Sequence, residues 1–198
     1  RKRMVFVGTG KYLEASHTES ASFSQQTLYG IMDADASATL ADPRSVLVKQ
    51  IQTNDGINRK VTSNSIDYST KRGWYIDFAD AGERQNVDGM LVFGTLLTPT
   101  TVPTSSVCSP GGYSWLNFVD YKTGGYVAGA TNSGVRYGSI IVGLGVMYLD
   151  KDGDGDREPV VTVTVADEVT PKVAPGIPFG SGGEGFTKRK MIWRELIE

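Results

Sequence analysis

Apolar and polar residues alternate along this chain in short stretches, a pattern that predicts β-strands. The stretches are rich in Val, Ile, Thr and aromatic residues and are separated by turns containing Gly, Pro, Asn or Asp. We find no convincing window with the roughly 3.6-residue apolar period of an amphipathic helix. The expected strands are Met4–Gly8, Thr27–Met32, Ser45–Gln52, Ile57–Val61, Gly73–Phe78, Met90–Leu97, Gly111–Asp120, Tyr126–Ala130, Ile140–Leu149 and Pro159–Ala166.

The connections between these stretches carry further predictions. Asn54-Asp55-Gly56 has the composition of a tight hairpin turn. Residues Thr98–Pro110 are rich in Thr, Ser and Pro and are expected to form a long loop. After Pro171 the alternation stops, so we expect a domain over residues 1–170 and an extended C-terminal tail, residues 171–198, packed on it.

Short antiparallel strands with Gly-rich turns predict an all-β fold, which is a sandwich, a barrel or part of a β-propeller. The turn Asp120-Tyr121-Lys122-Thr123-Gly124 follows an aromatic strand, as a similar turn does in propeller blades. A blade needs four strands, so this chain would hold about two to three blades. Because these are too few to close a ring, we expect a piece of a larger protein.

Composition and charge narrow the classes of function. The formal net charge is -2, so the overall balance does not indicate binding to nucleic acid or to an anionic membrane. The longest apolar run, Ser139–Leu149, contains two glycines and is too short to cross a bilayer as a helix. Cys108 is the single cysteine, which excludes an internal disulfide. We expect it to be a buried free thiol, with a cysteine outside this chain as the alternative partner.

The most specific chemical motif is a run of alternating carboxylates between the last two expected strands. A Ca²⁺ ion takes about six to eight oxygen ligands, and alternate acidic residues on a tight loop can supply them. In an EF-hand-type reading, Gly155 takes the sixth position, where the chain must turn sharply. The expected metal ligands are Asp150, Asp152, Asp154, Asp156 and Glu158.

The surroundings of this loop differ from those of a helical EF-hand. Val161 stands where the bidentate Glu would close the loop, and both flanking segments are expected to be strands. The sequence therefore predicts a calcium loop at the tip of a β-hairpin. The alternative is a solvated acidic turn without metal, in which Lys151 and Arg157 offset the charge repulsion. Magnesium is disfavoured because it prefers few protein carboxylates and keeps its waters.

Several stretches, taken together and in order, resemble the PilC/PilY family of type IV pilus proteins. The similarity runs from about Arg3 to Leu196, nearly the whole chain. The segments that carry it are Val5–Leu13, Gln26–Ile31, Gly73–Tyr75, Gly82–Arg84, Cys108–Leu116 and Trp193–Leu196.

The resemblance implies part of a C-terminal domain with a modified β-propeller fold. It further implies an exported, non-enzymatic protein at the pilus tip or the bacterial outer membrane surface. Its roles would be pilus assembly, the extension–retraction balance of twitching motility, and adhesion. The implied partners are minor pilins and pilus tip components, with a host or abiotic surface as a receptor. Family members carry acidic Ca²⁺ loops, and the resemblance assigns this role to Asp150, Asp152, Asp154, Asp156 and Glu158.

Two other functions remain open from the sequence. A calcium-dependent glycan- or protein-binding module would use an exposed aromatic residue beside the ion, and Tyr148 is near but is expected to be a sheet residue. A quinoprotein-like propeller enzyme has little support, because there is one His and no Gly-x-Ser-x-Gly motif. Glu83 and Arg84 resemble a catalytic acid and clamp, but an ion pair tying a loop to its sheet is favoured. We therefore expect no catalytic site.

Overall fold

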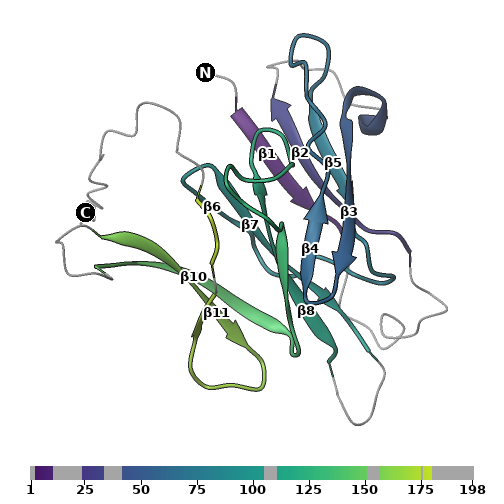
Figure 1. The fold of residues 1–198 in the computed structure, drawn as a ribbon. Coiled ribbons are helices and arrows are strands. Elements are labelled where there is room, and N and C mark those ends of the chain that lie inside the picture. The colour runs from purple at the N-terminus through teal and green to yellow at the C-terminus, as the bar shows by residue number, and fades with distance from the viewer. Residues whose placement is uncertain are drawn as a thin grey trace, which may run out of the picture.

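A computed structural model describes residues 3–10, 24–33, 42–104, 111–150, 157–174 and 176–179 (Figure 1). The described chain is all-β, as predicted. Its strands form a nine-stranded sheet in the order β1-β2-β5-β3-β4-β9-β8-β7-β6 and a three-stranded sheet in the order β10-β11-β12. The elements are β1 (Arg3–Gly8), β2 (Thr27–Asp33), the 3₁₀ helix η3 (Pro43–Val46), β3 (Val48–Asp55), β4 (Asn58–Val61), β5 (Gly73–Asp77), β6 (Met90–Val92), β7 (Thr95–Val102), β8 (Tyr113–Asp120), β9 (Gly134–Tyr137), β10 (Ile141–Leu149), β11 (Glu158–Val165) and β12 (Lys172–Val173).

The larger sheet is continuous because β3 pairs with β5 on one side and with β4 on the other. Residues Val48–Ile51 pair in parallel with β5, whereas Gln52–Asp55 pair antiparallel with β4. All other pairs in this sheet are antiparallel. The sheet curls into a half-barrel (Figure 1). The prediction of an all-β, propeller-like fold is thereby confirmed. The nine strands form one sheet, however, and not separate blades of four strands.

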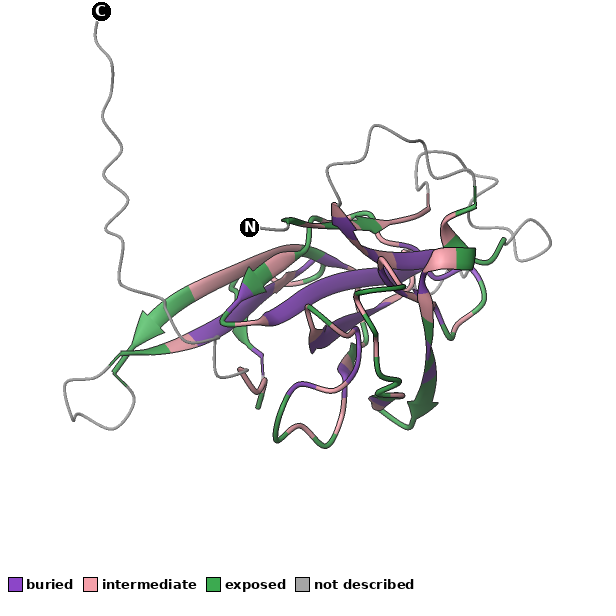
Figure 2. Cartoon of the chain, turned by 90° about the horizontal axis from the view of Figure 1, so that it is seen from above, coloured by how far each residue is buried: buried purple, intermediate pink, exposed green. Residues whose placement is uncertain are grey.

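Two apolar cores hold the sheets together. One surrounds the fully buried Trp74, which packs with Leu28, Ile76 and Val119 inside the curl of the larger sheet. The other lies between β7–β8 and the β10–β11 hairpin, where Phe118 meets residues such as Val163. The hairpin buries its base in this core and extends an exposed tip away from the body (Figure 2).

The prediction of a single strand over Met90–Leu97 is wrong, because the chain reverses at Phe93 and Gly94. Both residues have positive φ, 45° and 79°, which is the backbone of a two-residue hairpin turn. The return strand β7 is buried throughout. The predicted loop over Thr98–Pro110 is therefore also wrong for Thr98–Val102. Pro99 is tolerated because the pairing of β6 with β7 ends at Leu97, so the missing N–H interrupts no bond to β6.

The remaining connections give mixed outcomes. The turn at Asn54-Asp55-Gly56 is confirmed, with Asp55 paired to Asn58 and φ 64° at Gly56. Residues 126–130, expected as a strand, form turns instead, and the short strand β9 follows them unpredicted. Cys108 and most of the tail, residues 180–198, lie outside the described residues, so the division at residue 170 stays a prediction.

Candidate functional site

The hairpin that carries the predicted calcium loop is present. β10 and β11 are antiparallel, and Leu149 pairs with Glu158, so residues 150–157 connect the two strands. Paired Cα atoms lie roughly 4.5–5.5 Å apart, which places Asp150 and Glu158 together at the hairpin tip. Asp152, Asp154 and Asp156 lie outside the described residues. Among the described residues, Asp150 and Glu158 included, no three His, Cys, Asp or Glu side chains gather into a metal-binding group.

Tyr148, beside the loop, is a sheet residue in β10, as predicted, and is half exposed. Its ring packs edge-on against Phe93 in the β6–β7 turn, with centroids 6.3 Å apart. Phe93 also packs edge-on against Phe179 at the same distance. These aromatic contacts join the hairpin to the larger sheet just below the acidic loop.

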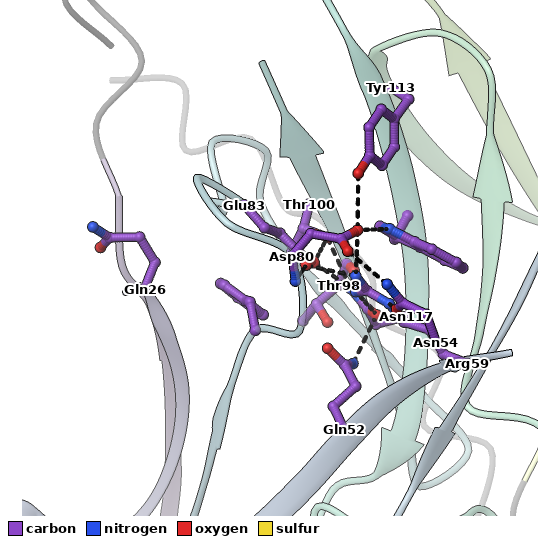
Figure 3. Close-up of polar contacts among 12 residues, drawn as sticks. Gln26, Gln52, Asn54, Arg59, Asp80, Glu83, Thr98, Thr100, Tyr113 and Asn117 are labelled. Carbon is purple, nitrogen blue, oxygen red and sulfur yellow. Dashed lines mark hydrogen bonds and ion pairs between the residues drawn. The ribbon is translucent and has the colours of Figure 1, made fainter. Parts of the chain in front are cut away.

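A second polar site, buried inside the larger sheet, centres on Arg59 of β4 (Figure 3). The guanidinium is fully buried and binds Glu83, also fully buried, through two parallel hydrogen bonds. Arg59 Nη1 donates to Glu83 Oε1 at 2.5 Å, and Nη2 donates to Oε2 at 2.6 Å. Such bidentate, charge-assisted pairs are among the strongest hydrogen bonds in proteins.

Asp80 is the second carboxylate of this site. Its Oδ2 lies 3.2 Å from Arg59 Nη2 and accepts hydrogen bonds from Trp115 Nε1 at 2.7 Å and the Tyr113 hydroxyl at 3.1 Å. Its Oδ1 accepts from Asn54 Nδ2 at 2.5 Å. One guanidinium thus faces two carboxylates, and neutral donors compensate the second one. Burial and the neighbouring Asp80 raise the pKa of Tyr113 to about 12, so its hydroxyl stays a donor at neutral pH.

Neutral side chains complete the site. Asn117 of β8 accepts from Arg59 Nη1 at 2.9 Å and donates to Thr100 Oγ1 at 3.0 Å. Thr100 in turn donates to Glu83 Oε1 at 2.5 Å. The Arg59 guanidinium also lies 4.0 Å from the centre of the Trp115 ring, at cation–π distance. We call Arg59, Asp80, Glu83, Asn117, Thr100, Trp115, Tyr113 and Asn54 the Arg59 cluster.

The Arg59 cluster fastens the turn after β5 to the sheet. Asp80 and Glu83 lie on that turn, and the sequence correctly predicted an ion pair between a loop residue and the sheet. The partner of Glu83 is Arg59, however, and not Arg84, whose Nε donates to the Gly82 carbonyl. The sequence analysis did not find Arg59 as a buried residue. The alternation in β4 was the available sign, because Arg59 lies on the same buried face as Val61.

A third polar group surrounds Asp77 at the end of β5. Arg44 Nη2 and Lys49 Nζ lie 2.6 and 2.9 Å from its carboxylate oxygens, and Thr27 Oγ1 donates to Oδ1 at 2.7 Å. Arg44 also lies over the Tyr75 ring, 4.8 Å from its centre. Burial alone would raise the pKa of Asp77, but hydrogen bonds from Lys49, Thr27 and Arg44 outweigh it and hold the pKa below its usual value.

The lowered pKa of Asp77 makes a prediction about acid stability. A carboxyl with a lowered folded-state pKa stabilises the fold fully above its unfolded pKa of about 3.9, and this contribution is lost as pH falls through the folded value. We expect Asp77→Asn to lower the melting temperature by roughly 2–4 °C at pH 7. The difference from wild type should shrink steadily below about pH 4. Thermal melts between pH 7 and pH 2.5 test this, and a constant difference would contradict it.

Comparisons with known proteins indicate the family. Over 139 residues the chain is 33% identical to the "Type IV pilus biogenesis factor PilY1 homolog" of Xylella fastidiosa, a match covering 65% of this chain and 9% of that protein. Over 146 residues it is 30% identical to the "Type IV pilus biogenesis factor PilY1" of Pseudomonas aeruginosa PAO1, covering 62% and 13%. The protein of the same name from strain UCBPP-PA14 is 26% identical over 200 residues, covering 78% and 17%.

These similarities support the PilY family for this chain. The resemblance seen in the sequence is thereby confirmed at the level of the family. The chain spans about a tenth of the length of the curated relatives it matches, 9% and 13% for the first two. No family model and no solved structure matches it. Among its described residues, none forms a helix of the length and apolar character that a membrane crossing requires.

Proposed function

We propose that this chain is a calcium-binding, non-enzymatic module of a type IV pilus biogenesis protein. The observation that carries the proposal is an antiparallel hairpin whose strands flank an acidic sequence, in a chain whose relatives are named type IV pilus biogenesis factors. We place the module outside the cell, at the pilus tip or the outer membrane surface. Its proposed partners are minor pilins and other tip components, and a host or abiotic surface.

The hairpin supports calcium binding on physical grounds. Asp150 and Glu158 stand at the two ends of the loop, and three further aspartates lie between them in the sequence. Carboxylates this close in the sequence repel one another, and a divalent cation would remove the repulsion while fixing the loop. The donor set consists of oxygen atoms, which suits a hard cation. The ion would thereby stabilise the exposed tip of the hairpin.

Calcium is expected to raise the melting temperature of the chain. With a Kd of about 0.1 mM, roughly 1 mM Ca²⁺ adds about 1.4 kcal/mol to the free energy of unfolding. For a chain of this size that corresponds to a rise of about 3–6 °C. The double variant Asp152→Ala, Asp154→Ala should abolish this rise, measured by calorimetry with and without chelator.

The matched control is Asp167→Ala, Glu168→Ala, which removes two acidic side chains from the turn after β11 in the same sheet. This control should keep the calcium-dependent rise. A rise that survives in the Asp152, Asp154 variant would exclude the loop as the site. In cells that carry the full-length gene, the same variant should change the number of surface pili and the rate of twitching, whereas the control should not.

The Arg59 cluster supports a role without catalysis. Glu83 is fully buried and Asp80 is partly buried, and both carboxylates are bound by Arg59 and by neutral donors. Carboxylates held in this way connect the turn to the sheet, as a structural ion pair does.

A further inference from the structure

The half of the larger sheet formed by β1, β2, β5 and β3 has two faces of different character. Its inner face carries Leu28, Trp74 and Ile76, which belong to the core inside the curl. Residues that alternate with these along the strands point to the opposite side of the sheet. The apolar members of this second set, which we call the outer face, are Val5, Val7, Tyr29, Ile31, Ile51 and Tyr75.

The strand register makes the outer face continuous from one strand to the next. Residues that pair across two strands lie on the same face of a sheet. Val7 pairs with Tyr29, and Tyr29 pairs with Tyr75, whose ring centre lies 6.1 Å from that of Tyr29. In the next row, Val5 pairs with Ile31. The apolar side chains of the outer face are therefore neighbours and form one surface.

The outer face is open to solvent over much of its area. About half of the surface of Val5, Val7 and Ile51 is exposed, 50%, 46% and 53% respectively. The other three members are partly exposed. Single exposed apolar residues are common on protein surfaces, whereas a contiguous set across several strands is typical of an interaction site.

The other half of the same sheet shows what covers such a face. On β7 and β8, Leu96 and Val119 belong to the core around Trp74, whereas the alternate residues Leu97 and Phe118 point the other way. These two are buried against β11 of the three-stranded sheet. A second β-sheet thus packs on this half, face to face. In Figure 1 the β10–β11 hairpin lies on the left, away from β2, β5 and β3 on the right, so it does not cover the outer face.

Charged side chains lie along the β3 side of the outer face. Arg44 and Lys49 both form ion pairs with Asp77, and Arg44 also lies over the Tyr75 ring. Two cations thus share one carboxylate, which leaves one positive charge in excess. The rest of the face is apolar, as in permanent interfaces, which resemble a domain core cut in half. A matching surface has apolar side chains at its centre and a carboxylate opposite Arg44 or Lys49.

The matched relatives are much longer than this chain, which covers 9% and 13% of the first two. We propose that a second β-sheet, from a part of the full-length protein outside these 198 residues, packs on the outer face. Its inward side chains are apolar, and one of its carboxylates pairs with the excess charge of Arg44 and Lys49. The apolar character of the face suits a permanent contact within one polypeptide. This contact is independent of calcium at the hairpin tip.

Hydroxyl-radical footprinting tests this contact by comparing the 198-residue chain with the full-length protein. Ile51 is the reporter, and Ile57, exposed in the turn between β3 and β4, is the matched control. The oxidation rate of a side chain follows its exposed surface, so covering a half-exposed residue down to roughly a tenth slows its oxidation about fivefold. We expect this slowing at Ile51 in the full-length protein, with protection of Tyr29 and Tyr75, and none at Ile57. The result should be the same with Ca²⁺ and with chelator.

A second measurement uses Ile51→Lys, with Ile57→Lys as its control. In the 198-residue chain both variants should unfold close to wild type, because both positions are exposed. In the full-length protein, Ile51→Lys should return the oxidation of Tyr75 to its rate in the 198-residue chain, because a lysine charge is costly inside an apolar contact. Ile57→Lys should leave Tyr75 protected.

Equal oxidation of Ile51 in the two proteins would overturn the proposal. So would an Ile51→Lys variant of the full-length protein in which Tyr75 stays protected. Protection that appears in the 198-residue chain as its concentration rises would assign the outer face to a second copy. Protection that appears only when another pilus protein is added would assign it to a separate partner. Either result would replace the proposed contact.

Discussion

Replacing Arg59 with Met is expected to lower the free energy of unfolding by about 3–5 kcal/mol. The substitution keeps an apolar chain in the buried space but leaves Glu83 and Asp80 without their cation. Glu83 would then be a fully buried charge without a cation, which costs far more than an exposed ion pair contributes, and partly buried Asp80 would keep only its neutral donors. Urea denaturation followed by tryptophan fluorescence measures the change, because Trp115 packs directly on the guanidinium.

A triple variant separates lost charge pairing from lost packing. Arg59→Met combined with Asp80→Asn and Glu83→Gln removes all three charges, so it should recover a substantial part of the loss. Lys60→Ala is the exposed control, because Lys60 pairs with Asp55 at the surface, and its melting temperature should stay close to that of wild type. A change below about 1 kcal/mol in Arg59→Met would show that the Arg59 cluster does not hold the turn to the sheet.

The second large effect is expected at Trp74, whose replacement by Ala should cost about 3–5 kcal/mol. The indole is fully buried in the core of the larger sheet, and its Nε1 donates to the Tyr121 carbonyl at 3.0 Å. Two glycines, Gly30 and Gly124, leave the room it occupies, since a Cβ on either would lie 2.4 Å from the ring. The substitution would therefore leave a large cavity and an unpaired carbonyl.

Trp74→Phe is the matched comparison, because it keeps most of the ring but loses the N–H donor, and it should cost clearly less than Trp74→Ala. From the opposite side, Gly124→Ala should also destabilise the chain, because Gly124 has φ 68° and its new methyl would meet the Trp74 ring. Equal stability of Gly124→Ala and wild type would mean that the turn after β8 adjusts freely. Thermal and urea unfolding of the three variants together test this packing.

Local patterns in the sequence predicted most strands correctly and failed at the β6–β7 hairpin, at residues 126–130 and at β9. In Met90–Leu97 the apolar run hides a reversal at Phe93 and Gly94, because both sides of the turn are equally apolar. In Thr98–Val102 the Thr and Pro composition is typical of a loop, yet these residues are buried between β8 and the turn that carries Glu83. Alternation is informative only where one face of a strand meets solvent.

The two polar sites also differ in whether the sequence could reveal them. The acidic loop could be found from the sequence because its carboxylates are neighbours along the chain, and the hairpin around it follows from two β-branched runs. The Arg59 cluster could not, because Arg59, Glu83 and Asn117 come from three distant segments. An isolated Arg in a short strand carries no local sign of the carboxylate that it will meet.

The sequence by itself determined the all-β class, the hairpin with its acidic loop, and the PilY family, because these depend on residue order over short distances and on similarity along the chain. Only the tertiary structure decided that β3 joins two halves of one curled sheet, that Glu83 pairs with Arg59, and that β1 and β6 enclose a cavity. These features arise from contacts between residues far apart in the chain, and their energies depend on burial, which appears only when the sheet curls.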